Sequence, residues 1–235
     1  MGNYAERIVC LTEETTETLY ALGEDWRIVG ISGFTVRPAR ARREKPRVSA
    51  FTSARIDRIL ALNPDLVLGF SDLQADIAAE LVRRGVQVHI FNHRSVLEIL
   101  TMIRLVGAMV GCQERAERYA AALEHRIRVA DHGMPRPRVY FEEWDDPMIS
   151  GIRWVSELVG IAGGDDCFPE LAVEPLARNR IIADPGEVIE RRPDIIVGSW
   201  CGKKFRPQAV AGRSGWSEIP AVLPVRDVSC DSWAS

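Results

Sequence analysis

The chain has 235 residues, of which 46% are hydrophobic and 27% are charged, a composition typical of a globular protein and unlike that of a disordered or collagen-like chain. The formal net charge of −3 provides no overall positive field, which argues against nucleic acid as a main partner. The longest apolar runs are strand-sized, shorter than the roughly 20 residues that a membrane-spanning helix needs, so the chain is not predicted to be embedded in a membrane.

Short apolar runs alternate with amphipathic segments from Arg7 onward, which is typical of parallel strands joined by helices. In the first part of the chain this alternation predicts strands at 8–11, 28–32, 66–70 and 86–91, and helices at 15–22, 53–62 and 74–84. Between them, the basic run from Arg37 to Arg47 is interpreted as a solvated loop between lobes. Together these elements predict one α/β lobe.

Two consecutive helices are predicted next. Ser95 and Glu98 have the spacing of a capping box, which favours a helix from Ser95 to about residue 110. A charged, alanine-rich helix then runs from Gln113 to about residue 131, where the breaker segment His132–Pro137 begins.

The strand and helix pattern resumes beyond residue 137, with strands predicted at 138–142 and 195–199 and helices at 152–162 and 187–192. The simplest interpretation is an α/β fold of two lobes with central parallel sheets, joined by one long helix. The predicted boundaries are 1–111 for the first lobe, 112–131 for the connecting helix and 132–235 for the second lobe.

The residues just after each predicted strand are the candidate binding residues, because ligands of open α/β sheets bind beyond the carboxyl ends of the strands. In the first lobe they include Glu14, Phe34, Phe70 and His93. In the second lobe they are the run Glu142, Glu143, Trp144, Asp145 and Asp146, together with Trp200 and Cys201. If the two lobes face each other, these aromatic rings and carboxylates converge on a single cleft.

The acidic run of the second lobe places four carboxylates around one indole, a charge density that a solvated loop does not require. We interpret Glu142, Glu143 and Asp145 as groups that hold the polar or cationic rim of a ligand, with a solvated acidic turn as the alternative. Trp200, at the end of a strand, is placed to form a stacking wall.

Cys201 leaves two other functions open. The five cysteines are scattered without a CxxC pair, which favours reduced thiols, and two lysines follow Cys201 closely enough to favour its thiolate. The protein could capture a transition-metal ion in the cytosol through Cys201, His93 and cleft carboxylates, or it could be an enzyme with Cys201 as nucleophile. The sequence contains no GxGxxG, GxxxxGK[ST] or GxSxG motif, which argues against dinucleotide, P-loop and α/β-hydrolase chemistry.

Three segments resemble a known family: residues 7–23 (RIVCLTEETTETLYALG), residues 29–34 (VGISGF) followed by Pro38, and residues 56–70. They are similar to the helical-backbone class (class III) of ABC-importer substrate-binding proteins, and within it to vitamin B12-binding and iron-siderophore-binding members. The resemblance covers roughly residues 7–200. It implies two Rossmann-like lobes bridged by a rigid helix, a cleft that closes only slightly, and no catalysis.

The resemblance also implies roles for individual residues. Phe34, Phe51 and Phe70 fall where B12-binding members place aromatic rings against the corrin, and Trp144 and Trp200 lie in the loops that complete such a cleft. The implied function is capture of a corrinoid (cobalamin-like) or metal-chelate ligand for ABC-type import, with no cofactor required and no enzymatic activity.

An ABC permease is the implied protein partner. Asp57 matches the first-lobe carboxylate that docks an arginine of the permease, and the second-lobe counterpart aligns with Gly186, one residue before Glu187. No signal peptide precedes the first strand, so we expect a cytoplasmic protein as written and a periplasmic one if a signal peptide has been removed. The chain is short after Val222 compared with the family, which predicts an exposed apolar face that is prone to form a homodimer or to aggregate.

Overall fold

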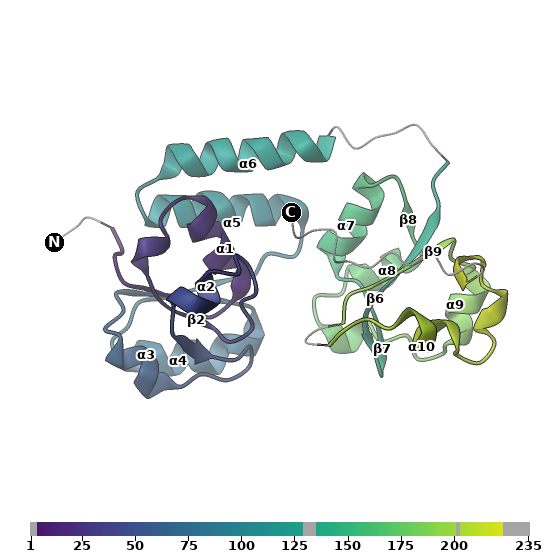
Figure 1. Ribbon diagram of the computed structural model, residues 1–235, viewed down its shortest axis with the longest axis horizontal. Coiled ribbons are helices and arrows are strands. Elements are labelled where there is room, and N and C mark those ends of the chain that lie inside the picture. Colours follow the sequence, from purple (N-terminus) through teal and green to yellow (C-terminus); the bar gives the residue numbers. More distant parts are fainter. Residues whose placement is uncertain (1–3, 129–134, 201–202, 223–235) are drawn as a thin grey trace. The chain divides into compact units, whose positions relative to one another are not determined.

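The computed structural model describes residues 4–128, 135–200 and 203–222 (Figure 1). The chain divides into two compact units. Unit 1 comprises the residues up to His93 together with Leu97–His125, and unit 2 comprises Arg94–Val96 and the residues from Arg126 onward. The predicted α/β class with central parallel strands is confirmed in both.

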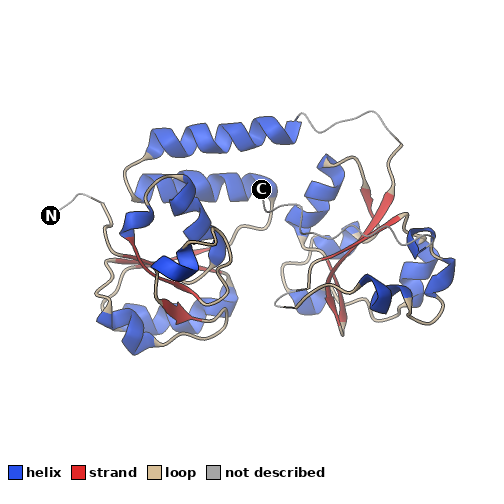
Figure 2. Cartoon of the chain, in the orientation of Figure 1, coloured by secondary structure: helices blue, strands red, loops and turns tan. Residues whose placement is uncertain are grey.

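Unit 1 contains a five-stranded, fully parallel sheet in the order β3-β2-β1-β4-β5. Its strands are β1 (Ile8–Cys10), β2 (Ile28–Ser32), β3 (Arg47–Ser49), β4 (Leu66–Phe70) and β5 (Val88–Phe91). Its helical segments are α1 (Glu13–Ala21), η1 (Asp25–Arg27), α2 (Ala41–Glu44), α3 (Ile56–Ala61), η2 (Asp72–Gln74), α4 (Ala75–Arg83), α5 (Val96–Met109) and α6 (Gln113–Arg128). Figure 2 shows the helices on both faces of this sheet.

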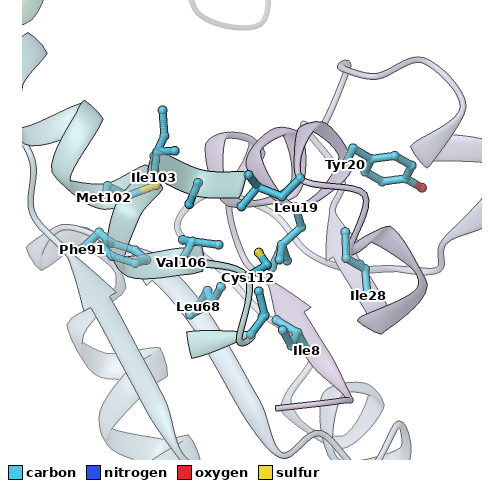
Figure 3. Close-up of a cluster of buried hydrophobic side chains, with 14 of the residues drawn as sticks. Ile8, Leu19, Tyr20, Ile28, Leu68, Phe91, Met102, Ile103, Val106 and Cys112 are labelled. Atoms are coloured by element: carbon cyan, nitrogen blue, oxygen red, sulfur yellow. The ribbon is translucent and has the colours of Figure 1, made fainter. Parts of the chain in front are cut away.

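The two faces of the unit 1 sheet carry separate hydrophobic clusters. Ile8 and Leu68 point into the cluster that α1, α5 and α6 cover (Figure 3). Cys10 belongs to the same cluster, whereas Val9 and Val67 belong to the cluster on the other face. Successive strand residues point to opposite faces, so a strand buried on both sides must be apolar at every position. The unbroken run Ile8-Val9-Cys10 is therefore the signature of a central strand.

Helix α6 packs as part of unit 1. Ala116 and Ala120 have no exposed surface, and a Cβ atom at Gly107 of α5 would lie only 2.2 Å from the Cβ of Ala116. The small residues let the two helices approach closely, and Arg115 adds an ion pair to the buried Glu24. The helix that the sequence predicts as a connector over 112–131 thus contributes to the core of the first unit through its N-terminal turns.

Unit 2 is built around one long strand. Its strands are β6 (Arg138–Asp145), β7 (Met148–Ser150), β8 (Asp165–Asp166) and β9 (Ile195–Gly198), and β6 pairs with the other three, in parallel with β8 and β9 and antiparallel with β7. The helical segments are α7 (Arg153–Ile161), α8 (Pro169–Ala172), η3 (Ala177–Asn179), α9 (Gly186–Arg191), α10 (Pro207–Ala211), η4 (Trp216–Glu218) and η5 (Pro220–Val222).

Two predictions about these elements are wrong. The basic run before β3 is not simply a loop, because it contains α2 and leads into an edge strand whose Val48 and Ser49 are buried. In unit 2, the strand predicted to end at Glu142 continues to Asp145 and returns as β7. Only Asp146 and Pro147 connect these strands, and a connection of that length can join antiparallel strands only. The acidic run therefore belongs mainly to a β-hairpin.

Candidate ligand-binding site

The carboxyl edge of the unit 1 sheet gathers the aromatic residues that the sequence singled out. Because all five strands are parallel, the segments that follow them lie at the same edge. Phe34 follows β2, Phe51 follows β3 and Phe70 ends β4. Phe34 is 55% exposed, and the other two rings are half-buried. Phe70 packs in part against the core of unit 1, and Phe34 presents most of the exposed aromatic surface at this edge.

Gln74 holds three of the loops at this edge together, and the sequence analysis did not identify it. Its side chain is fully buried, its Oε1 accepts a hydrogen bond from the backbone N–H of Phe70 at 3.0 Å, and its Nε2 donates to the carbonyl oxygens of Phe51 at 2.9 Å and Leu11 at 3.4 Å. One amide thus satisfies backbone groups after β1, β3 and β4. A lone glutamine at the start of a helix carries no sequence signal for that role.

The segment that bears Phe34 is also fixed by hydrogen bonds. The N–H of Gly33 donates to the carbonyl oxygen of Ser49 at 2.7 Å, and Oε1 of Glu13 accepts from the N–H groups of Val36 at 3.2 Å and Arg37 at 2.9 Å. Glu13, which sequence reasoning passed over in favour of its neighbour Glu14, therefore positions the loop. Preorganised loops lose less conformational entropy when a ligand binds.

Glu14 lies in the first turn of α1 at the same edge. Its Oε1 accepts a hydrogen bond of 2.6 Å from the hydroxyl of Thr12. Burial raises the pKa of this carboxyl above its ordinary value of 4.5, against the opposing effect of the Thr12 hydrogen bond. The predicted site residue is therefore a carboxyl whose charged form is disfavoured by its surroundings.

Two further exposed apolar side chains lie at this edge. Val36 is 52% exposed and Leu73 is 54% exposed, values close to that of Phe34. Both occupy segments that follow strands, where a soluble surface would ordinarily carry polar residues. We refer to Phe34, Val36, Phe51, Phe70 and Leu73 as the apolar rim of unit 1.

His93, the histidine considered as a metal ligand, packs beside this rim. Its ring centroid is 4.7 Å from that of Phe70 and 6.4 Å from that of Phe91. It also lines a surface pocket of about 270 Å³ between β5 and α5, together with His89 of β5. Burial lowers the pKa of His89, which favours the neutral form of this second imidazole.

The carboxyl edge of unit 2 is organised around Glu142, which has no exposed surface. Its carboxylate accepts hydrogen bonds from both terminal nitrogens of Arg213, at 2.5 and 3.0 Å, from the hydroxyl of Tyr140 at 2.8 Å and from Nε1 of Trp200 at 2.9 Å. Burial, together with the neighbouring carboxylate, raises the pKa of Tyr140, so its phenol remains a donor. The cluster joins β6, the end of β9 and the segment after α10.

The other two predicted carboxylates are paired as well. Glu143 accepts a hydrogen bond of 2.6 Å from Arg180, whose side chain is 2% exposed. Asp145 forms an ion pair with Lys203, and the Lys203 ammonium lies 4.0 Å from the centroid of the Trp144 ring. Nε1 of Trp144 in turn donates to the carbonyl oxygen of Asp146 at 2.8 Å.

These contacts correct the picture of an open acidic clamp. Glu142, Glu143 and Asp145 each face a cation of unit 2 itself, which removes most of the charge density that suggested a ligand contact. Trp200 is 5% exposed and packs edge-on against Phe205 at 5.0 Å, so it forms part of the core and not an exposed wall. The partner of Glu142 is Arg213, which lies far along the chain. Its presence in the sequence is the one sign that could have indicated a paired Glu142.

The residues predicted to contact a permease lie on short helices. Asp57 is exposed in the first turn of α3. Glu187 is half-buried in the first turn of α9, with its Oε2 3.6 Å from Nη2 of Arg191. Their placement at helix starts agrees with the preference of carboxylates for that position.

The metal and enzyme alternatives depend on Cys201, which lies outside the described residues. In the ranges that the structure describes, no three His, Cys, Asp or Glu side chains gather in a way that could hold a metal ion. Burial raises the pKa of Cys10 to about 12 and that of Cys167 to about 11, so these thiols stay protonated at neutral pH. None of the described helices has the length and apolar content of a membrane span.

Comparisons with known proteins cover nearly the whole chain. The sequence profile of a family described as "Periplasmic binding protein" matches residues 8–224. The vitamin B12-binding protein of Vibrio vulnificus (strain YJ016) is 24% identical over 236 aligned positions, which cover 92% of this chain and 78% of that protein.

Solved structures show the same fold. A possible iron-binding (periplasmic solute-binding) protein from Staphylococcus epidermidis has a TM-score of 0.77 at 19% identity, covering 94% of this chain and 88% of that one. The periplasmic heme-binding protein RhuT from Roseiflexus sp. RS-1 has a TM-score of 0.76 at 25% identity, covering 92% of this chain and 86% of that one. The matches span both units.

Proposed function

The chain belongs to the periplasmic binding protein family, and from this membership we propose that it captures a corrinoid or another metal chelate for import by an ABC permease. It is a binding protein and not an enzyme. The bound chelate is the cargo, and no resident cofactor is needed. A periplasmic location fits the relatives described above, and nothing in those comparisons supports the cytoplasmic expectation.

The observation that carries this proposal is the apolar rim of unit 1. Phe34, Val36 and Leu73 are each more than half exposed beside the half-buried Phe51 and Phe70, so a soluble unit presents apolar surface at the edge where ligands of this fold class bind. Aromatic rings gain dispersion and stacking energy against a flat ligand. The names of the relatives, which bind vitamin B12 or heme, support the same ligand class.

In this proposal Trp144 is the contact that unit 2 contributes to the ligand. Asp57 and Glu187 remain the proposed contacts to the permease. Glu142 and Glu143 act indirectly, because each holds a neighbouring arginine that shapes the edge.

Ligand titration tests the proposal. Purified protein is mixed with cyanocobalamin, hemin and a ferric hydroxamate siderophore, and binding is followed by tryptophan fluorescence and visible difference spectra. We expect saturable binding of at least one of these chelates, and about tenfold weaker binding for Phe34→Ala, since a stacked ring is lost.

Trp26→Ala is the matched control. Trp26 is an aromatic of unit 1 with 59% exposure, but it lies in η1, before β2, at the amino edge of the sheet. This variant should bind like the wild type. Absence of binding to all three chelates would refute the ligand class, and equal losses in both variants would refute the placement of the site.

A further inference from the structure

The basic residues of one segment of unit 1 have no part in the proposed function. Residues 37–58 contain eight of the chain's 30 lysine and arginine residues but only two of its 33 aspartate and glutamate residues. The chain as a whole carries a formal net charge of −3, so the remaining residues are acidic on balance. Positive charge is therefore concentrated in one short segment.

The fold brings this segment to one edge of the unit 1 sheet. It forms α2, β3 and the start of α3, and β3 is an outermost strand of the sheet. The N–H of Arg55 donates to the carbonyl oxygen of Val48 at 3.0 Å, and Ser49 forms an isolated bridge with Ala54, so the residues that lead into α3 run beside β3. We refer to five exposed side chains of this segment as the arginine edge: Arg42, Arg43, Arg47, Arg55 and Arg58.

The arginine edge keeps its charge. Arg37 and Arg40, earlier in the segment, pair with carboxylates at 3.4 and 3.7 Å, but within the described ranges none of the five side chains of the arginine edge forms an ion pair. Glu44, the carboxylate of α2, instead accepts a hydrogen bond of 2.8 Å from the hydroxyl of Tyr20. Five guanidinium groups of like charge repel one another, and an external anionic surface would relieve that repulsion.

We infer that the arginine edge binds the headgroups of anionic phospholipids and holds unit 1 against a membrane surface. A guanidinium forms two parallel hydrogen bonds with phosphate oxygens, which suits a surface of many equivalent phosphates. Each basic residue close to an anionic bilayer raises the partition coefficient about fivefold. Several arginines together therefore give measurable binding without a lipid anchor.

An exposed indole beside the basic segment favours a lipid surface over an acidic protein. Trp26 is 59% exposed, and the guanidinium of Arg27 lies 4.3 Å from its ring centroid. It borders the basic segment, because the neighbouring Asp25 pairs with Arg40 at 3.7 Å. Exposed tryptophan next to basic side chains is typical of proteins that lie at a membrane interface.

The proposed permease contact lies on the same part of unit 1. Asp57 stands between Arg55 and Arg58 at the start of α3. In this respect the inference rests on the proposed function, since a permease is held in a membrane. Binding to lipid would keep the protein close to its permease and would not require the chelate.

Co-sedimentation with lipid vesicles tests the inference. The wild type should bind vesicles that contain phosphatidylglycerol and should not bind vesicles of phosphatidylcholine alone, and added salt should release it. The triple variant Arg42→Gln, Arg43→Gln and Arg47→Gln should lower the partition coefficient by about tenfold or more. Trp26→Phe should remove a blue shift of tryptophan fluorescence that accompanies binding.

The matched control makes the same change of charge elsewhere. Arg126, Arg178 and Arg206 are exposed arginines outside the basic segment, and their joint replacement by glutamine should leave vesicle binding unchanged. Circular dichroism of both triple variants checks that a loss reflects the contact and not the fold.

Each outcome decides the question. Equal binding to neutral vesicles, or equal losses in the two triple variants, would overturn the inference. Binding of a soluble polyglutamate peptide without binding of anionic vesicles would assign the arginine edge to an acidic protein and would also overturn it. The vesicles contain neither chelate nor permease, so a failure here leaves the proposed function intact, and a failure of the chelate titration leaves vesicle binding to be measured by itself.

Discussion

The side-chain amide of Gln74 donates a hydrogen bond of 2.9 Å to the backbone carbonyl of Phe51, which lies 23 positions earlier in the chain. The same amide accepts from the N–H of Phe70. Two of the rings of the apolar rim are therefore positioned by one buried polar group. This arrangement makes the site depend on a residue that need not touch the ligand.

Gln74→Leu tests that dependence. Leucine fills a similar volume but leaves the N–H of Phe70 and the carbonyl of Phe51 without their partner, so we expect a loss of about 2 to 3 kcal/mol in the free energy of unfolding. Urea denaturation measures it, and chelate binding should weaken in parallel. The exposed Gln87, replaced by leucine, is the control and should change stability little. Equal stability of the two variants would contradict this role.

Gly69 in β4 tests how closely Gln74 is packed. A Cβ atom there would lie 2.6 Å from Oε1 of Gln74 and 2.7 Å from Cδ1 of Ile90. Gly69→Ala should therefore destabilise unit 1 by about 1 to 3 kcal/mol through overpacking. Gly160→Ala in α7 should have the opposite sign, because its nearest atom is 4.0 Å away and alanine favours helix by about 0.5 to 1 kcal/mol. Thermal denaturation of both variants shows whether the two changes in stability have opposite signs.

The buried pair of Glu142 and Arg213 should be essential to unit 2. Glu142→Gln leaves a guanidinium without its countercharge in the core, and we expect a loss of about 3 kcal/mol in the free energy of unfolding. The double variant Glu142→Gln with Arg213→Met should recover part of that loss, which denaturant titration would reveal as a coupling energy. Glu190→Gln, on the exposed face of α9, is the control and should be neutral. Additive losses would contradict a coupled pair.

The pH dependence of stability should change in Glu14→Gln. Burial raises the pKa of Glu14 in the folded protein above 4.5, so the stability linked to its protonated form is present below that pH and is lost as pH rises through the folded pKa. A glutamine side chain cannot ionise, and its Oε1 can still accept the hydrogen bond from the Thr12 hydroxyl. The variant should therefore be more stable than the wild type at pH 7 and nearly equal to it at pH 4.

Urea titrations at the two pH values measure the difference. Glu114→Gln is a suitable control, since that side chain is 95% exposed and should give the same result at both pH values. A Glu14→Gln variant that is less stable than the wild type at pH 7 would show that the carboxylate charge has a favourable partner in the folded protein.

The sequence predicted the order and type of the long elements because hydrophobic periodicity is a local property. Strands β2 and β4 match the predicted spans, and most other boundaries shift by one to three residues. Strand β3 was missed because three residues, one of them arginine, are too few for a recognisable pattern. The antiparallel β7 was missed because the carboxylates of β6 suggested a loop. In both cases, pairing with a neighbouring strand of the sheet decided the conformation.

The candidate site likewise has features that the sequence predicts and contacts that only the folded structure shows. The sequence by itself determined the α/β class and the carboxyl-edge aromatics Phe34 and Phe70, since these follow from local patterns and from where parallel strands end. The family and Phe51 were reached through the resemblance to known binding proteins. Only the tertiary structure decided that Glu142 is a buried anchor for Arg213 and that Asp145 is paired with Lys203. The ion pairs of Asp145 with Lys203 and of Glu142 with Arg213 join residues that are 58 and 71 positions apart. The strength of an ion pair depends on the distance between the charges in space, which local sequence patterns do not show.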